Sequence, residues 1–476
     1  MASRRDIYQS YQFTVQRVVS GLVLRETDPA QVPLRRLGGT MFASIMVAVI
    51  ALAITGVIGV INPGGNKTWK SEGKVIVEED TGAQFVWLKN PETGEFLLHP
   101  VLNLASGALL VGTSQIVEVS HASLEGAPRG PRLGIPDAPD SIPPTDDFLT
   151  GPWTLCSLPA QTQSGELVPS TALVVGRERS SGIPIDDSIA VVNDIEAGAV
   201  YLVWNGHRFL AADPTAVLTG LGLRDVPQIE AGTAMLTALP DGGTLAPSAP
   251  AGRGQPSSTA SGLLVGQIVM TSSGSDASSY YLVLDEGLQA ISEVQALITL
   301  ADPTLSTAYP GAAIEAIEIP AAQANQLPHD QLGDPQFSDP PRVPPAPALV
   351  QGKTSTICAS FSSGTAEIDI AVEAQVEGAD TATATPQRTQ NGAVLADQVL
   401  TPSGSAALVR SVMSPTAEEG PLYLVTDEGR KWAIPDDEAL QSLGLTSVEP
   451  VLMPASLVAR IPEGSALDKK AAGTPS

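Results

Sequence analysis

The chain has 476 residues and a formal net charge of −25, with 51 acidic and 26 basic side chains. So large an acidic excess repels phosphate groups, which excludes nucleic acid and anionic lipid headgroups as partners of the acidic part. Charged residues make up 16 % of the chain and aromatic residues 4 %, while 44 glycines and 40 prolines favour short strands separated by many turns.

The first 36 residues are expected to contain one amphipathic helix. Apolar side chains recur there at steps of three and four residues, as they do on one face of a helix. The residues on this face are Tyr8, Tyr11, Val15, Val18, Val19 and Leu22. A helix lying in the membrane interface and a helix docked on a cytoplasmic partner both fit the pattern. We predict docking, because so large an apolar face is rarely left uncommitted, and assign it to Tyr8, Tyr11, Val15, Val18 and Leu22.

Residues 37–61 form one uncharged apolar run. At about 1.5 Å per residue, a helix of this length crosses a hydrocarbon core of roughly 30 Å with some tilt. Arg35 and Arg36 precede the run, and the residues Asn62-Pro63-Gly64-Gly65 end the helix pattern on the other side. The run therefore predicts a single-pass membrane protein with its transmembrane helix at residues 37–61.

The positive charges set the expected orientation of this helix. Six arginines and three acidic residues precede the run, while the nearest cations on the other side are Lys67, Lys70 and Lys74. By the positive-inside rule, residues 1–36 lie in the cytoplasm and residues 62–476 lie outside the plasma membrane. The exterior then carries 20 basic and 48 acidic side chains.

An internal repeat runs through the exterior. Three units begin with Tyr-Leu-Val, at residues 201–203, 281–283 and 423–425, and a degenerate first copy begins at Gln84. A glycine-containing turn, a second apolar run and a helix-like stretch follow in each unit. This order predicts a hairpin, a capped helix and a further strand in every copy. Four loosely similar β-rich segments in a row are the simpler alternative.

The chain has two cysteines, Cys156 and Cys358, and both lie on the expected oxidising side of the membrane. Two thiols in that compartment predict a structural disulfide. Each cysteine falls in one of the two long inserts between repeat units. The predicted fold is therefore a large, β-rich α+β exterior in which four repeats surround a central module, and the disulfide joins the two inserts that build that module.

The expected division of the chain follows from these features. The membrane-proximal regions are a cytoplasmic helix in 1–36, the transmembrane helix in 37–61 and the first repeat in 62–115. The remaining regions are the N-terminal insert of the central module in 116–190, repeat two in 191–245, a linker in 246–262, repeat three in 263–325, a Pro-rich linker with the C-terminal insert of the central module in 326–410, repeat four in 411–466 and a disordered tail in 467–476.

No catalytic, cofactor-binding or metal-binding residues are predicted. The nearest approach to a phosphate-binding loop is residues 347–354, PALVQGKT, whose first position is Pro347 instead of glycine and whose lysine is Lys353. The four histidines are scattered, and neither cysteine has a partner at the spacing of a metal site. The sequence therefore favours a protein without an active site.

The whole layout resembles EccB, a membrane component of the actinobacterial type VII (ESX) secretion system. The resemblance covers essentially the entire chain and is carried by several short segments in a fixed order. They are the residues Tyr11 to Leu22 before the span, LHPVLNL at 98–104, GIPDAP at 134–139, WTLC at 153–156 and the four repeats.

This resemblance implies a structural core subunit of a protein export machine. Family members assemble with an EccC-type ATPase and with the membrane subunits EccD and EccE, supply much of the extracytoplasmic mass, and support export of WXG100-type proteins. Self-association of the exterior is expected as well. Some relatives carry an ATPase label, so an extracytoplasmic ATP hydrolase is one alternative, and a free-standing envelope-binding receptor is another.

Overall fold

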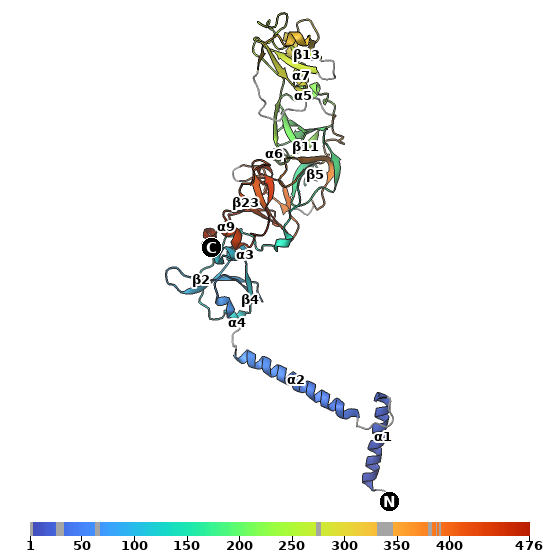
Figure 1. The fold of residues 1–476 in the computed structure, drawn as a ribbon, viewed down its shortest axis with the longest axis vertical. Helices are drawn as coiled ribbons and strands as arrows, with labels where there is room; N and C mark the ends of the chain where they lie inside the picture. The colour runs from blue at the N-terminus through green and yellow to red at the C-terminus, as the bar shows by residue number, and fades with distance from the viewer. Residues whose placement is uncertain are drawn as a thin grey trace. The chain divides into compact units, whose positions relative to one another are not determined.

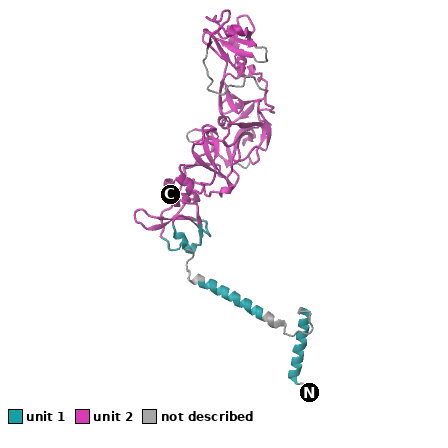
Figure 2. Cartoon of the chain, in the orientation of Figure 1, with its two compact units in different colours: residues 1–71, 77–83, 117–127 teal, residues 72–76, 84–116, 128–476 magenta. Residues whose placement is uncertain are grey.

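A computed structural model describes residues 3–24, 33–61, 67–272, 278–330, 346–378, 383–386, 388–389 and 392–476. Figure 1 traces its helices and strands along the chain. The chain divides into two compact units (Figure 2). The first comprises residues 1–71, 77–83 and 117–127, and the second comprises residues 72–76, 84–116 and 128–476. Each unit is described by itself below.

The first unit contains two long helices, α1 (Arg4–Leu24) and α2 (Pro33–Ile61). Within α2, residues Gly39–Val57 have a mean hydropathy of 2.3 and no side chain buried inside the protein, as expected for a helix in lipid. Among the described residues, α2 is the one helix long and apolar enough to cross a membrane. The predicted helix break at residues 62–65 lies outside the described part of the chain.

A tryptophan anchors the short helix η1 (Thr68–Lys70) within the same unit. Trp69 is 1 % exposed, and its Nε1 donates a hydrogen bond to the carbonyl oxygen of Ser123 at 3.2 Å. Ser123 lies in the short helix α4 (His121–Leu124). Burial of a whole indole ring with its N–H satisfied is a stable arrangement, so this tryptophan holds η1 on α4.

Among the described residues, the strands form four small sheets and one larger sheet. The first small sheet has the order β3-β2-β1-β4, with β1 (Val75–Glu78), β2 (Gln84–Lys89), β3 (Phe96–Pro100) and β4 (Ile116–Val119). The second has the order β11-β8-β9-β10-β12, with β8 (Ile189–Asp194), β9 (Ala199–Trp204), β10 (His207–Ala211), β11 (Ile229–Ala231) and β12 (Asp241–Leu245).

The third small sheet has the strand order of the second, and the fourth has the strand order of the first. The third has the order β16-β13-β14-β15-β17, with β13 (Ile268–Ser272), β14 (Ser278–Val283), β15 (Leu288–Ile291), β16 (Ile317–Glu318) and β17 (His329–Asp330). The fourth has the order β24-β23-β22-β25, with β22 (Ala406–Val412), β23 (Leu422–Thr426), β24 (Lys431–Ile434) and β25 (Val451–Pro454). Every small sheet contains an antiparallel hairpin: β2–β3, β9–β10, β14–β15 or β23–β24.

The larger sheet has seven strands in the order β20-β21-β6-β5-β18-β19-β7. Its strands come from two distant stretches of the chain. The first stretch supplies β5 (Trp153–Gln161), β6 (Leu167–Val174) and β7 (Ser181–Pro184). The second supplies β18 (Ile357–Phe361), β19 (Ile368–Gln375), β20 (Thr383–Ala384) and β21 (Gln398–Leu400). Three strand pairs join them: β5–β18 and β7–β19, which are antiparallel, and β6–β21, which is parallel.

A capped helix follows each hairpin: α3 (Leu104–Val111), α5 (Pro214–Gly220), α7 (Glu293–Leu300) or α9 (Asp437–Ser442). In each, the cap side chain accepts a hydrogen bond from the backbone N–H three residues later, which satisfies one of the helix's orphan donors. The four cap residues are Asn103, Asp213, Ser292 and Asp436.

A second contact recurs in all four small sheets. One residue among the first three of the second hairpin strand donates its backbone N–H to the carbonyl oxygen of a proline. That proline lies 30 to 40 residues further on, and the bond is 2.8–3.0 Å long. The pairs are Leu98 with Pro128, Arg208 with Pro240, Leu288 with Pro328 and Lys431 with Pro462. This bond brings the next chain segment beside the hairpin.

The largest hydrophobic core joins the seven-stranded sheet to the second and fourth small sheets. The short helices α6 (Thr233–Ala238) and α10 (Ala455–Val458) contribute Met235, Leu236, Leu457 and Val458 to it. A second core packs α3 against the fourth sheet and α9, and a third packs α5 against α7. Adding a Cβ at Gly220 would place it 2.5 Å from the carbonyl oxygen of Leu297, so the α5–α7 contact requires glycine there.

Three expected boundaries differ from the structure. Strand β4, placed by the sequence in the central module at 116–190, belongs to the first small sheet. Strand β22 begins the fourth sheet at Ala406, ahead of the expected start at 411. Strand β17 extends the third sheet beyond 325. The edge strands β4 and β17 carry little periodicity of their own, because their pairing partners lie far away in the sequence.

The C-terminal tail at 467–476, expected to be disordered, contains the helix α11 (Lys469–Ala472). Leu467 and Ala472 are fully buried in the core shared by α3 and α9. The side chain of Asp468 caps α11 by accepting from the N–H of Ala471. The composition of the tail was misleading, because its few apolar residues fill a cavity that other segments build.

The linker expected at 246–262 also packs on the protein. Arg253 donates to Asp302 at 3.1 Å, to Thr304 at 2.7 Å and to the carbonyl oxygen of Ser248 at 2.6 Å. The side chains of Arg253 and Asp302 are only 14 % and 10 % exposed. The segment is therefore held against the short helix η3 (Pro303–Ala308) by a buried ion pair. The Pro-rich stretch of the other predicted linker, residues 335–345, lies outside the described residues.

This ion pair predicts a stability that depends on pH. Burial raises the pKa of the Asp302 carboxyl, but hydrogen bonds from Thr304 and Arg253 outweigh it and hold the pKa below its ordinary value of 3.8. Folding thus favours the ionised form, so the stabilisation is complete above about pH 4 and is lost as the pH falls through the folded pKa. Asp302→Asn should cost about 2 kcal/mol at pH 7.

Thermal unfolding followed by circular dichroism from pH 7 down to pH 3 measures this difference. The gap in midpoint between the natural chain and Asp302→Asn should shrink at the acidic end. A gap of constant size over the whole range would show that the Asp302 charge does not stabilise this segment.

Candidate functional site

The predicted disulfide is present in the structure. Cys156 on β5 and Cys358 on β18 lie directly opposite each other, with their Cα atoms 4.0 Å apart, and the bond joins residues 202 apart in the sequence. Both cysteines are 0 % exposed and pack against Ala371 and Ala374. The bond fastens the two stretches of chain that build the seven-stranded sheet.

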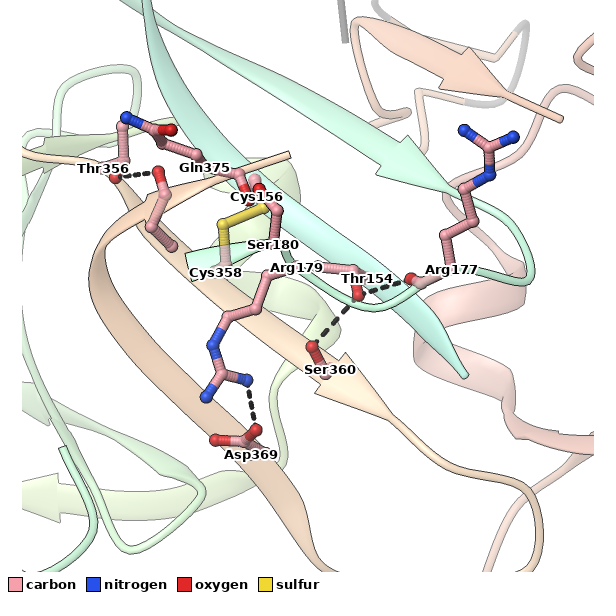
Figure 3. Close-up of a disulfide and its surroundings, with 11 residues drawn as sticks. Thr154, Cys156, Arg177, Arg179, Ser180, Thr356, Cys358, Ser360, Asp369 and Gln375 are labelled. Carbon is pink, nitrogen blue, oxygen red and sulfur yellow. Dashed lines mark hydrogen bonds and ion pairs between the residues drawn. A yellow bond between two sulfur atoms is a disulfide. The ribbon is translucent and has the colours of Figure 1, made fainter. Parts of the chain in front are cut away.

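Polar side chains surround the disulfide (Figure 3). Thr154, two residues before Cys156, donates to the carbonyl oxygen of Arg177 at 2.8 Å and lies 3.0 Å from the hydroxyl of Ser360. Arg179 forms an ion pair with Asp369 on β19. These contacts tie the loop between β6 and β7 to β5 and β19, so the position of Arg179 depends on the same sheet that holds the disulfide.

The side chains predicted to dock on a partner are exposed on α1. Their exposed fractions are 62 % for Tyr8, 69 % for Tyr11, 42 % for Val15, 57 % for Val18 and 80 % for Leu22. The prediction omitted Ile7 and Phe13, which are 62 % and 57 % exposed. Ile7 lies four residues before Tyr11 and extends the predicted face, whereas Phe13 lies outside the three-and-four spacing, which is why periodicity did not find it. The described apolar surface of α1 is therefore wider than one face.

Lys353, the lysine of the phosphate-loop-like segment, does not occupy a phosphate-binding loop. Its Nζ lies 3.0 Å from a carboxylate oxygen of Glu230, and its carbonyl oxygen accepts from the N–H of Glu230. The N–H groups of Gln351 and Gly352 point at the hydroxyl of Ser355. The strand β18 follows where a phosphate-binding loop would open a helix, so the segment lacks the N-terminal dipole that phosphate requires.

The histidines have separate local partners. His99 lies 2.9 Å from the carbonyl oxygen of Pro131, His207 lies 2.8 Å from that of Asn205, and His121 lies 2.5 Å from a carboxylate oxygen of Glu78. His329 packs beside the ring of Tyr281. Within the described ranges, His, Cys, Asp and Glu side chains do not gather in groups of three or more that fit a metal ion.

A buried group of cations went unnoticed in the sequence. Lys431 is 6 % exposed and donates to the carbonyl oxygen of Val458 at 2.9 Å, with Glu463 at 3.7 Å. Burial lowers the pKa of the Lys431 amine. Burial also lowers the pKa of the Arg460 guanidinium, and the charge of Arg208 lowers it further. These cations gather where α6 meets α10.

One sequence signal marks this group. Tyr201, Arg208 and Asp241 in the second sheet match Tyr423, Lys431 and Glu463 in the fourth in order and nearly in spacing. In both sheets the cation lies over the tyrosine ring, at 5.8 Å and 5.1 Å from the ring centre, and near the acid. Arg460, which follows α10, contacts α6 by donating to the hydroxyl of Thr237 at 2.9 Å. Aligning the repeats residue by residue reveals the pairs, but not the contact of Arg460 with Thr237.

The curated proteins that resemble this chain are EccB proteins of ESX secretion systems. The curated relatives include "ESX-3 secretion system ATPase EccB3" of Mycolicibacterium smegmatis, 27 % identical over 98 % of this chain and 89 % of that protein. They also include "ESX-2 secretion system ATPase EccB2" of Mycobacterium tuberculosis, 26 % identical over 92 % of this chain and 88 % of that protein. EccB3 of Mycobacterium tuberculosis is 30 % identical over 60 % of this chain and 54 % of that protein.

Solved structures share the fold. One is a chain of an intact ESX-5 inner membrane complex, with a TM-score of 0.61 and 22 % identity, covering 100 % of this chain and 96 % of that chain. Another is from an EccB3 dimer of the ESX-3 core complex, with a TM-score of 0.58 and 24 % identity, covering 84 % of this chain and 99 % of that chain. A model of the family described as "Type VII secretion system ESX-1, transport TM domain B" matches residues 1–475. The chain therefore belongs to the EccB family of type VII secretion membrane components.

Proposed function

We propose that this chain is a structural subunit of a type VII secretion complex, contributing to its assembly on the outer side of the plasma membrane. The observation that carries this proposal is the family match over residues 1–475, on a chain with one helix able to span a membrane. The fold supports it, because a chain of an ESX-5 inner membrane complex has the same architecture over the whole length. A chain with several small hydrophobic cores is suited to a subunit of a complex, because the surface over each core can contact a different neighbour.

The proposed partners are an EccC-type ATPase and the membrane subunits EccD and EccE, together with a second copy of this chain. Native mass measurement of the tagged, full-length chain, purified from its own cells in mild detergent, tests this set. A large species containing these subunits is the expected result. Recovery of the chain as a single free species from gentle extraction would contradict the proposal and favour a free-standing receptor.

We further propose that α1 docks on the cytoplasmic partners through Tyr8, Tyr11, Val15, Val18 and Leu22. Their exposure supports this, because an uncovered apolar surface of this size normally marks an interaction site. A Val15→Asp, Val18→Asp double variant should release the chain from the complex. Each aspartate would lose the apolar contact of the valine that it replaces, which is worth about 1–3 kcal/mol of binding free energy. Burying its charge in the interface would cost further binding free energy through desolvation.

Co-purification with the ATPase subunit, compared at equal membrane levels, measures this effect. A Gln9→Ala, Gln16→Ala variant on the same helix is the matched control and should co-purify normally. Undiminished co-purification of the double aspartate variant would move the docking surface to α2 or to the exterior.

The proposed orientation places the N-terminus in the cytoplasm and the β-rich region outside. The six arginines before α2 support it by the positive-inside rule. A reporter enzyme active only outside the membrane should be active when fused after Ser476 and inactive when fused before Met1. The reverse pattern would invert the topology and place α1 on the outer side.

We also infer that the four small sheets are copies of one unit arranged around the seven-stranded sheet. The shared helix caps and the repeated proline contact support this. Two glycines also occupy matching positions at the second and fourth small sheets. A Cβ at Gly242 would lie 2.4 Å from the ring of Phe209, and one at Gly464 would lie 2.3 Å from Nε1 of Trp432, so equivalent glycines sit under equivalent aromatic rings.

A further inference from the structure

An open depression lies on the seven-stranded sheet, on its β7 side, where the loop before β7 meets β18 and β19. Its volume is about 290 Å³, close to the lower end of the range for ligand pockets, roughly 300–1,000 Å³. The side chains that matter for binding come from the loop and the two strands: Glu178, Arg179, Ser180, Ser360, Ser362 and Asp369. A depression of this size has room for one ring-sized ligand.

An arginine and an aspartate lie next to each other in its lining, Arg179 and Asp369, and Figure 3 shows the contact between them. Nη1 of Arg179 donates to Asp369, which is its one hydrogen-bond partner among the described residues. The Arg179 side chain is 15 % exposed and therefore well fixed, while that of Asp369 is 49 % exposed. The remaining guanidinium N–H groups and the second carboxylate oxygen thus offer donors and an acceptor next to each other.

The hydroxyls of Ser180 and Ser360 add acceptors. Thr154 already donates to the carbonyl oxygen of Arg177, so Ser360 donates its own proton to Thr154. Ser360 is 6 % exposed, and its contact with Thr154 at 3.0 Å fixes its position. Ser180 uses its proton on the carbonyl oxygen of Gln375 at 3.1 Å, so its oxygen is left to accept. Adjacent donors and acceptors of this kind match neighbouring hydroxyls, because each hydroxyl accepts one hydrogen bond and donates another.

The charges narrow the class of ligand. The charges of Arg179 and Asp369 cancel, and Glu178 leaves one negative charge on a chain whose net charge is −25. Phosphates and acidic sugars are repelled by such a site, whereas neutral and amino sugars are not. We propose that this depression binds one neutral or amino sugar unit of a glycan outside the cell membrane, a function beyond the structural role.

The expected affinity is low for a single sugar. The depression has no aromatic residue among its lining side chains to stack on a sugar ring, so polar contacts alone hold the ligand. A dissociation constant on the order of 1 mM is expected for one site. Several copies of the chain in one complex would raise the apparent affinity for a polymeric glycan.

Saturation-transfer NMR on the full-length chain tests this proposal, with the disaccharide of N-acetylglucosamine as the probe. The detergent must lack a sugar headgroup, so a zwitterionic amine oxide is suitable. Transfer to the probe is expected for the natural chain. Asp369→Asn and Arg179→Gln should each weaken binding at least five-fold. Ser362→Trp, at an exposed position, should block the depression and abolish binding without touching the ion pair.

The control is Arg388→Gln, which removes an arginine from a different ion pair, with Glu196 at 3.4 Å. It should bind the probe like the natural chain. Equal transfer in the natural chain and Ser362→Trp, or no transfer in the natural chain, would overturn the proposal. Equally strong binding of the acidic polymer polygalacturonate would overturn the assignment to neutral and amino sugars.

Discussion

Replacing Cys156 and Cys358 together by alanine is expected to lower the free energy of unfolding by about 2–5 kcal/mol. The bond closes a loop of 202 residues, so its loss greatly enlarges the set of unfolded conformations. Alanine is suitable because both positions are 0 % exposed among small apolar neighbours. The two halves of the seven-stranded sheet would then be held without a covalent link, by the β5–β18, β7–β19 and β6–β21 pairings.

Thermal unfolding of the full-length variant, followed by circular dichroism, measures the effect. Mass mapping of peptides without reduction should first find the Cys156–Cys358 link in the natural chain. The natural chain unfolded in the presence of a reductant serves as the matched control and should resemble the variant. An unchanged unfolding midpoint for the double alanine variant would show that β5 and β18 need no covalent link.

Replacing Trp432 by alanine is expected to cost about 3–5 kcal/mol and to loosen the junction between α3 and the fourth sheet. Trp432 is 0 % exposed in the core that contains α3 and α9. Its Nε1 donates to the carbonyl oxygen of Asp137 at 2.7 Å. The segment 134–139 is thereby attached to the fourth sheet, and the alanine variant loses the packing and this bond together.

Hydrogen exchange read out by mass spectrometry locates the effect. Exchange should rise in peptides covering 133–140 and 467–476, because both contact the same core, and stay unchanged in 278–330. Trp432→Phe is the matched variant: it keeps most of the ring and loses the N–H, so about 1–2 kcal/mol is expected. Exchange that rises equally throughout the chain would mean that this junction is not a separate unit.

Much of the local structure follows from the sequence. The uncharged run in α2, the pattern of α1 and the caps before α5 and α9 lie within a few residues of one another, and short-range physics decides them. The same holds for the hairpins at 201–211 and 423–434, whose strands are neighbours in the chain. The cysteine pairing was accessible because the chain offers one possible pair.

The candidate sites depend on contacts between residues that are far apart in the sequence. Arg460 meets Thr237 across 223 residues, and Arg179 meets Asp369 across 190. Neither pair has a spacing, periodicity or motif that links its two members, so the sequence did not indicate them. The exposed Phe13 was missed for another reason, because it lies off the one helical face that the three-and-four spacing defines.

The long apolar helix α2, the helix α1, the hairpins and the disulfide were all predictable, because neighbours in the chain or a single available partner decide each of them. The order of strands in each sheet, the helix in the tail and the packing of the 246–262 segment became visible in the folded structure alone. The physical reason is that a few apolar or charged side chains gain stability only against a surface that distant segments build, as Leu467 does in the core of α3 and α9.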